Sequence, residues 1–169
     1  MRKFILGFAF LACSLSGWAQ RGRSDAPAGE VYLGYSFLNG DTLSKASGFE
    51  AALTGNVNDW LGLKADLSGN YKSIAGLHAR EYNMLFGPQL NRRMDRVNLF
   101  AHGLFGVAHI SSDFAPSDTA AAWVLGGGAD YKLTDRFSWR IAQLDYHGAH
   151  VFSNTQTDFR FSTGPILRF

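Results

Sequence analysis

Apolar side chains alternate with polar or small ones over residues 61–71, and this period of two constrains the fold more than any other feature of the chain. Leu61 and Leu67 fall on one face of the segment, whereas Lys64 and Asp66 fall on the other. A helix would place Lys64 and Leu67 on the same face, so the pattern excludes an amphipathic helix and predicts a β-strand.

The same alternation recurs along most of the chain. A hairpin is predicted first, because the polar turn residues Asn56-Val57-Asn58-Asp59 separate residues 61–71 from a similar segment before them. Strands of about nine to fourteen residues suit a tilted crossing of a bilayer. We therefore predict an all-β fold, an eight-stranded antiparallel up-and-down transmembrane β-barrel. Its strands are expected near residues 30–38, 49–56, 61–71, 79–90, 97–110, 120–133, 137–146 and 159–169.

One segment changes phase. Residues 137–141 alternate cleanly, but beyond Ala142 the apolar positions move to the other parity. A β-bulge inserts one extra residue into a strand and so restores the facing of the residues after it. A bulge at this point would place Gln143 and Asp145 on the same face as Arg140.

Two classes of connection are expected between the strands. Those near residues 56–60, 91–96 and 134–136 are short and polar, and the others are expected to be longer, near residues 39–47, 72–78, 111–119 and 147–157. Outer membrane barrels have short turns on the periplasmic side and longer loops outside. We therefore expect both termini on the periplasmic side, together with the short turns.

The N-terminal segment predicts export. Arg2 and Lys3 precede an apolar run over residues 4–15, and small residues at Gly17 and Ala19 indicate cleavage before Gln20. This is the pattern of a secretory signal peptide, which is too short to span a membrane. We expect a cleavable signal peptide over residues 1–19, a short lead over 20–27 and the barrel domain over 28–169.

Composition narrows the function classes once the signal is removed. With 46% hydrophobic and 18% charged residues the chain is neither disordered nor fibrous. Arg2 and Lys3 account for the formal net charge of +2, so the remaining chain is neutral and nucleic acid is not an expected partner. No later stretch has the run of about eighteen apolar residues that a membrane helix needs.

The charged residues of the predicted strands share one face. Five acids and five bases balance there, which is what a closed interior requires because an unpaired charge would be desolvated without compensation. Eight strands leave a bore that side chains can fill, so we predict a lumen plugged by ion pairs. The predicted network is Glu50, Lys64, Asp66, Glu81, Asp130, Lys132, Arg140, Asp158, Arg160 and Arg168.

The opposite face is apolar and predicts contact with lipid. It carries leucine, valine and phenylalanine, with aromatic residues toward the strand ends that suit interfacial girdles: Tyr35, Trp60, Tyr82, Tyr131 and Trp139. A secreted soluble β-sandwich with one solvated face is the alternative fold. The aromatic chain end disfavours the sandwich.

The chain ends on an aromatic residue with apolar residues at alternate positions behind it. Phe161, Leu167 and Phe169 form this pattern, which resembles the C-terminal signal read by the bacterial barrel-assembly machinery. We expect that machinery to be a partner during biogenesis.

Several segments together resemble a known family, the small OmpA-like or opacity-type outer membrane β-barrel domain. They are residues 48–51, 86–88, 100–106, 126–130 and 160–164, and the likeness spans about residues 28–169. It implies a monomeric eight-stranded barrel in the outer membrane of a Gram-negative-type bacterium, in contact with lipid and lipopolysaccharide. It implies no single activity, and tethering through a C-terminal peptidoglycan-binding domain is not expected.

We therefore expect an integral outer membrane barrel with a structural or surface-interface role, without enzymatic activity, cofactor or metal. A narrow pore for ions or small solutes is the alternative. A lipid A deacylase is a third hypothesis, because His150 and Ser153 resemble its His–Ser pair. Two residues separate them where that family has one, so on a strand they would point apart.

Asp145, His147 and His150 have weak geometry for a metal site.

Overall fold

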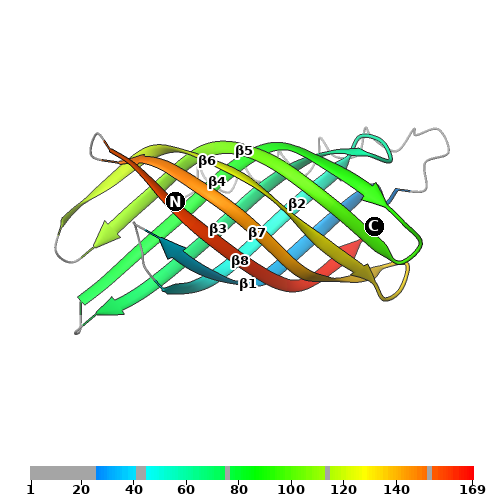
Figure 1. Cartoon of the computed structure of the whole chain (residues 1–169), viewed down its shortest axis with the longest axis horizontal. Helices are drawn as coiled ribbons and strands as arrows, with labels where there is room; N and C mark the ends of the chain where they lie inside the picture. The colour runs from blue at the N-terminus through cyan, green and yellow to red at the C-terminus, as the bar shows by residue number, and fades with distance from the viewer. Residues whose placement is uncertain (1–25, 41–44, 75–76, 113–114, 152–153) are drawn as a thin grey trace, which may run out of the picture.

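The computed structural model describes residues 26–40, 45–74, 77–112, 115–151 and 154–169, and these form a closed antiparallel barrel (Figure 1). The predicted eight-stranded fold is confirmed. The strands are β1 (Gly29–Gly40), β2 (Ala46–Asn56), β3 (Leu61–Ile74), β4 (Leu77–Arg93), β5 (Val97–Ser112), β6 (Ala115–Lys132), β7 (Phe137–Val151) and β8 (Asn154–Arg168). Within the described ranges, no helix is long and apolar enough to cross a membrane.

Each strand pairs with the next, and β1 pairs with β8 to close the barrel. Tyr35 of β1 lies opposite Phe49 of β2 on one side and Thr163 of β8 on the other. The seam extends to the end of the chain, where Gly29 and Phe169 exchange two backbone hydrogen bonds of 3.0 Å. Closure pairs the backbone N–H and C=O groups that an open sheet edge would expose. A bilayer core does not tolerate such unpaired groups.

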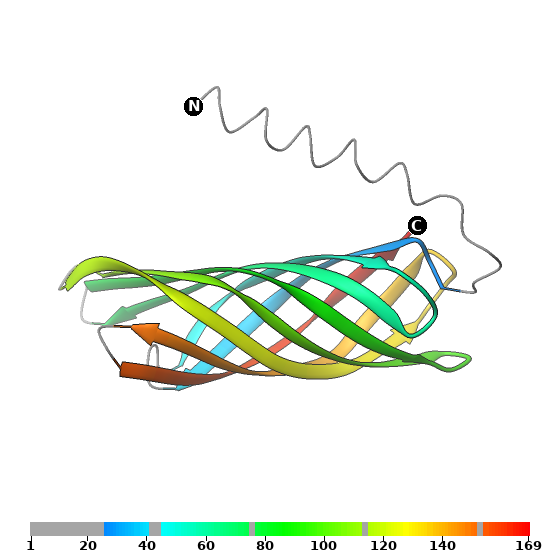
Figure 2. The same ribbon diagram turned by 90° about the horizontal axis from the view of Figure 1, so that it is seen from above.

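Three tight turns, at residues 57–60, 94–96 and 133–136, lie at the same end of the barrel as the start of β1 and the end of β8 (Figures 1 and 2). We call this the turn end, and the opposite one the far end. In the first turn the Asn58 side-chain oxygen accepts hydrogen bonds from the backbone N–H groups of Trp60 and Leu61, at 3.0 and 2.7 Å. In the third, Thr134 Oγ1 accepts one from the Phe137 N–H at 3.0 Å.

The prediction of longer loops at the far end was wrong for three of the four connections; residues 41–44 of the other, near 39–47, lie outside the described residues. Most of residues 72–78, 111–119 and 147–157 belong to strands, which reach 18 residues in β6. Lys72 pairs with Ala79, and His109 with Thr119, beyond the positions where the sequence turns polar. Polarity there marks where the lipid-facing band stops, whereas the hydrogen-bond ladder continues because each further pair satisfies backbone groups.

The phase change in β7 is a bulge, as the sequence predicted. Asp130 pairs with Arg140 while the preceding Ala129 pairs with Ala142, so β7 has one extra residue here. The register against β8 shifts at the same point, between Arg140 and Gln143. Arg140, Gln143 and Asp145 consequently all point into the barrel and are buried.

The predicted signal peptide over residues 1–19, and most of the predicted lead over 20–27, lie outside the described residues. Both stay predictions. The first described strand begins at Gly29.

Candidate functional site in the barrel lumen

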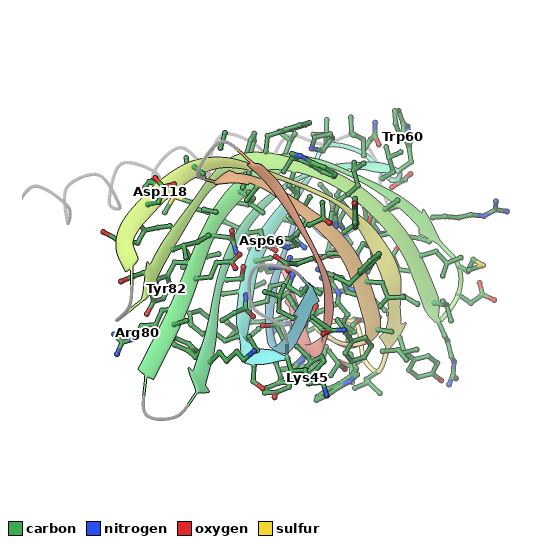
Figure 3. All side chains as sticks on the ribbon, turned by 60° about the vertical axis from the view of Figure 1, so that its left-hand side comes forward. Lys45, Trp60, Asp66, Arg80, Tyr82 and Asp118 are labelled. Carbon is green, nitrogen blue, oxygen red and sulfur yellow. The ribbon has the colours of Figure 1, made fainter. Side chains whose placement is uncertain are left out.

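Polar and apolar side chains take the places that a membrane barrel requires. Outward-facing Leu33, Met84 and Phe105 are 58%, 64% and 67% exposed, whereas inward-facing Lys64 and Arg160 are fully buried. Figure 3 shows Asp66 inside the barrel, with Trp60, Arg80 and Tyr82 on its outside. The exposed surface is therefore apolar and the enclosed space is charged, the reverse of a soluble barrel.

Arg160 of β8 is the centre of the lumen. Its Nη2 lies 2.6 Å from Asp145 Oδ2 on β7, and its Nη1 lies 3.4 Å from Asp66 Oδ1 on β3. Glu50 on β2 is 3.6 Å away from the same guanidinium. Arg160 Nη1 also donates a hydrogen bond to Ser68 Oγ at 2.7 Å. One side chain thus connects strands on several sides of the bore, which only a residue with several fixed donors can do.

Lys64 supplies the second buried cation. Its Nζ lies 3.2 Å from Glu50 Oε1 and 3.3 Å from Asp66 Oδ2, and all three side chains are fully buried. Glu50 is further held by Ser162, which donates to its Oε2 at 2.7 Å, and by Gln143, which donates to its Oε1 at 2.8 Å. We call Glu50, Lys64, Asp66, Asp145 and Arg160 the central charge cluster.

Arg140 makes a second ion pair one step toward the turn end. Its Nε donates to Asp130 Oδ1 at 2.8 Å, and its Nη1 to Gln143 Oε1 at 2.6 Å. The guanidinium carbon lies 4.3 Å from the Tyr32 ring centroid and 4.1 Å from that of Phe100. Cation–π contacts of this kind are strongest where water is excluded. Gln143 joins this pair to the central charge cluster through Glu50.

Histidines add to the inner wall. His102 Nε2 lies 3.0 Å from Asp145 Oδ1, so Asp145 is shared between an imidazole and Arg160. His147 is also buried, and His109 faces outward, with its Nδ1 2.8 Å from Thr119 Oγ1. No role was predicted for His102, although its parity on β5 places it on the inner face.

The ten predicted network residues do not all meet. Glu50, Lys64, Asp66, Asp130, Arg140 and Arg160 lie in the central part of the lumen. Glu81 is buried on β4 and accepts a hydrogen bond from Asn83 at 2.8 Å. Asp158 is buried on β8. Arg168 lies at the turn end, 3.6 Å from Glu30.

Lys132 is the network residue that lies at the rim of the lumen. Its side chain is 40% exposed, and its Nζ lies 2.7 Å from Asp135 Oδ1 in the third turn. That hydrogen bond, with the lysine charge, holds the pKa of Asp135 below its usual value. Lys132 is the last residue of β6, where the barrel wall no longer covers the inner face.

The interior also contains apolar residues, at positions with the inward parity of their strands. Leu85, Leu104 and Val124 pack together with Ala108 and Ala122 in one buried cluster. Tyr32, Ala52 and Ile166 form another. Leu85 lies between lipid-facing Met84 and Phe86, so composition alone gives no sign of the side to which it points. Such packing fills part of the bore beside the buried charges.

Aromatic side chains gather on the outer surface at both ends. Near the far end Phe49, Tyr71 and Tyr82 make successive ring contacts, and Trp123 contacts Tyr146, which contacts Phe159. At the turn end the exposed aromatic residues are Trp60, Phe137, Trp139 and Phe169. These two bands have the positions expected of interfacial girdles.

The three residues of the predicted assembly signal point outward. Phe161, Leu167 and Phe169 are all exposed on β8 and at its end. The Phe169 ring packs against Gly29, where an added Cβ would come within 2.6 Å of it. Phe169 therefore also covers the seam between β1 and β8.

Other candidate chemistry lies mostly beyond the described side chains. The side chain of His150, and Ser153 as a whole, are outside them, so the hydrolase pair has no described geometry. His78 is likewise outside. Among the side chains that are described, no group of three or more His, Cys, Asp or Glu residues is arranged to hold a metal ion.

Comparison with known proteins gives one family. The family model described as the outer membrane protein beta-barrel domain matches residues 6–164 of the chain. No curated protein matches the sequence.

Solved structures share the fold at low sequence identity. Neisserial surface protein A (NspA) superposes with a TM-score of 0.70 at 15% identity, covering 88% of this chain and 100% of that one. Ail, the attachment invasion locus protein of Yersinia pestis, gives 0.57 at 16%, covering 85% and 99%. OprG from Pseudomonas aeruginosa gives 0.58 at 11%, covering 86% and 97%. At such identities the likeness concerns the fold.

Proposed function

Because the chain belongs to the outer membrane protein β-barrel domain family, and is thus an integral barrel of the cell outer membrane, we propose that it has a structural and surface-interface role, with a lumen closed by ion pairs. In this proposal the turn end faces the periplasm and the far end faces the exterior. The apolar outer face binds membrane lipid and lipopolysaccharide, and the barrel works as a monomer without enzymatic activity.

The observation that carries the proposal is the set of contacts around Arg160. Its guanidinium reaches carboxylates on β2, β3 and β7, and two of these carboxylates also contact Lys64. All five side chains are fully buried. An ion passing through would have to separate buried pairs, and breaking a single such pair typically costs about 3–5 kcal/mol.

Planar-bilayer recording tests closure. The full chain, purified from outer membranes and inserted, should give no stable unitary current steps. Insertion is established separately by a change of gel mobility on heating, which folded barrels show. Stable steps from the unaltered protein would overturn the closed-lumen proposal and favour the narrow pore.

A pair of variants sharpens the recording. Arg160→Ser removes the group that links the three carboxylates and should produce measurable conductance. Arg92→Ser is the matched control, because Arg92 is an exposed arginine at the turn end of β4. If Arg160→Ser does not insert, the silence or activity of the unaltered chain still decides the question.

The enzymatic hypothesis has its own test. Expression of the chain in a bacterium with intact lipopolysaccharide should leave the lipid A acyl pattern unchanged in a mass spectrum. Loss of an acyl chain that depends on His150 and Ser153 would replace the structural proposal with the deacylase hypothesis.

A further inference from the structure

A pocket opens at the turn end of the barrel, away from the central charge cluster. It has a volume of about 360 Å³. Four cationic side chains line it, and they come from different parts of the wall: Arg93 at the end of β4, Arg96 in the second turn, Lys132 at the end of β6 and Arg168 at the end of β8. Asp95 is the acidic residue among those lining it.

The nearby carboxylates leave this positive charge incompletely paired. Glu30 alone faces two guanidinium groups, at 3.4 Å from Arg93 Nη2 and 3.6 Å from Arg168 Nε. Both distances exceed those of a strong charge-assisted hydrogen bond. Asp135 Oδ1 forms an ion pair with Lys132 Nζ at 2.7 Å. Arg96 forms a hydrogen bond with the Tyr131 hydroxyl. Arg93 also donates to the Asp59 backbone oxygen through Nη1, so the unmet demand at Glu30 falls on the Nε atoms of Arg93 and Arg168.

Atoms buried beside the pocket lack partners. Arg93 Nε and Arg168 Nε have no hydrogen-bond acceptor among the described residues. Arg168 is only 9% exposed, so water has little access to that donor. A buried donor without an acceptor typically costs about 1–3 kcal/mol. A ligand that brings acceptor oxygens to this pocket would recover that free energy.

From these observations we infer that the turn-end pocket binds a phosphate-class oxyanion, held by Arg93 and Arg168 with Arg96 and Lys132 around it. Planar guanidinium groups match the geometry of phosphate oxygens and can donate to them in pairs. The volume exceeds a bare phosphate, so the pocket admits a phosphate that carries a small substituent. The exposed girdle residues Trp60, Phe137 and Trp139 lie at the same end, which places the pocket near the level of lipid headgroups.

Free phosphate and the headgroup of a phospholipid share this chemistry, and one experiment distinguishes between them. The ¹⁵N-labelled full chain is delipidated in dodecyl maltoside, a detergent without phosphate, and followed by NMR. One arm adds inorganic phosphate. The other adds dihexanoyl phosphatidylglycerol, with dihexanoylglycerol, which has no phosphate, as its blank. We expect saturable shifts of the backbone amides of residues 93–98, 132 and 168.

The pattern of response identifies the source. Saturation by both probes indicates that free phosphate suffices, whereas saturation by the lipid alone indicates a headgroup site. No saturable shift from either probe would overturn the inference.

Variants locate the site. Arg168→Gln and Arg93→Gln should each weaken binding by roughly tenfold or more, as expected for loss of a charge-assisted pair. Because these changes also affect Glu30, Arg96→Gln in the exposed turn provides a variant that leaves the buried pairs intact. Arg92→Gln, whose side chain faces outward and does not line the pocket, is the control and should bind like the unaltered chain. Equal binding by all four variants would place the anion elsewhere and overturn the inference.

Discussion

At the scale of single residues, the lumen depends on the difference between arginine and the other cations. Arg160 has donors on three nitrogens and contacts carboxylates on both sides of the bore, with a hydroxyl between them. Arg140 uses its flat face as well, because its guanidinium lies between two aromatic rings while its edge binds Asp130. A lysine could supply the charge at either position but not the fork or the flat face.

Replacement of Arg160 should destabilise the barrel strongly. In Arg160→Met the carboxylates of Glu50, Asp66 and Asp145 would stay buried, with Lys64 beside the first two and His102 beside Asp145 as the remaining ion-pair partners in direct contact. Removing one partner of a buried pair typically costs about 3–5 kcal/mol. Urea unfolding in lipid vesicles measures the loss. Arg92→Met, at an exposed position, should change the free energy of unfolding by less than about 0.5 kcal/mol. Similar values for the two variants would contradict the assigned role of Arg160.

At the scale of elements, the bulge in β7 decides which side chains form the cluster. If the same residues alternated regularly beyond Arg140, Gln143 and Asp145 would face lipid, and Leu144 and Tyr146 would face the lumen. The bulge lies where β7 contributes to both ion-pair groups, since Arg140 precedes it and Gln143 follows it. A local irregularity of one strand thus sets the electrostatics of the interior.

Deletion of Ala142 tests the bulge. Without Ala142, β7 alternates regularly, so Gln143 and Asp145 stay on the same face as Arg140 and only the bulge is lost. The contacts of Asp145 with Arg160 are therefore kept, and we expect the deletion variant to retain its heat-modifiable gel band.

The matched variant deletes one residue from a strand that has no bulge. Removal of Ala65 from β3, whose pairing with β2 and β4 is regular, would turn either Lys64 or Asp66 toward lipid, where a charge typically costs up to about 2–4 kcal/mol at the midplane. That variant should show no heat-modifiable band. Loss of the band in the Ala142 deletion as well would contradict the assignment of Ala142 to the bulge.

At the scale of the whole molecule, the chain end closes the barrel. Gly29 and Phe169 are hydrogen-bonded to each other across the seam, and the Phe169 ring packs on Gly29. The same residue is the last of the predicted assembly signal. Its side chain is 62% exposed, so most of the ring is accessible to a partner.

Phe169→Ser separates these two roles. If the barrel-assembly machinery reads the terminal aromatic, the variant should reach the outer membrane several-fold less than the unaltered protein. The purified variant should still refold in detergent, because only part of the ring is buried. Immunoblots of membrane fractions and the heat-modifiable band measure the two quantities.

Phe137→Ser is the matched control, because Phe137 is another exposed aromatic residue at the turn end and pairs with Leu167. It should assemble normally in cells. Equal losses in cells and in detergent for Phe169→Ser would assign Phe169 to packing at the seam and leave no role for recognition.

The order and number of strands followed from the sequence, because period-two alternation is a local property. Lys64 and Asp66 could be assigned to one face from a single segment, and the β7 bulge was visible as a change of parity beyond Ala142. Strand ends at the far side were not predictable in this way. There the hydrogen-bond ladder continues through polar residues such as Lys72 and His109, and pairing, not side-chain polarity, determines its length.

The partners inside the lumen were decided by the tertiary structure alone. Parity indicates that a side chain points inward, but its height along the bore depends on the stagger between strands, which no single segment records. That stagger brings Arg160 against Asp66 and Asp145 and leaves Lys132 at the rim with Asp135. By itself, the sequence determined which residues the barrel encloses. Closure of the sheet determined which of them touch, because contacts across the bore join residues far apart in the chain.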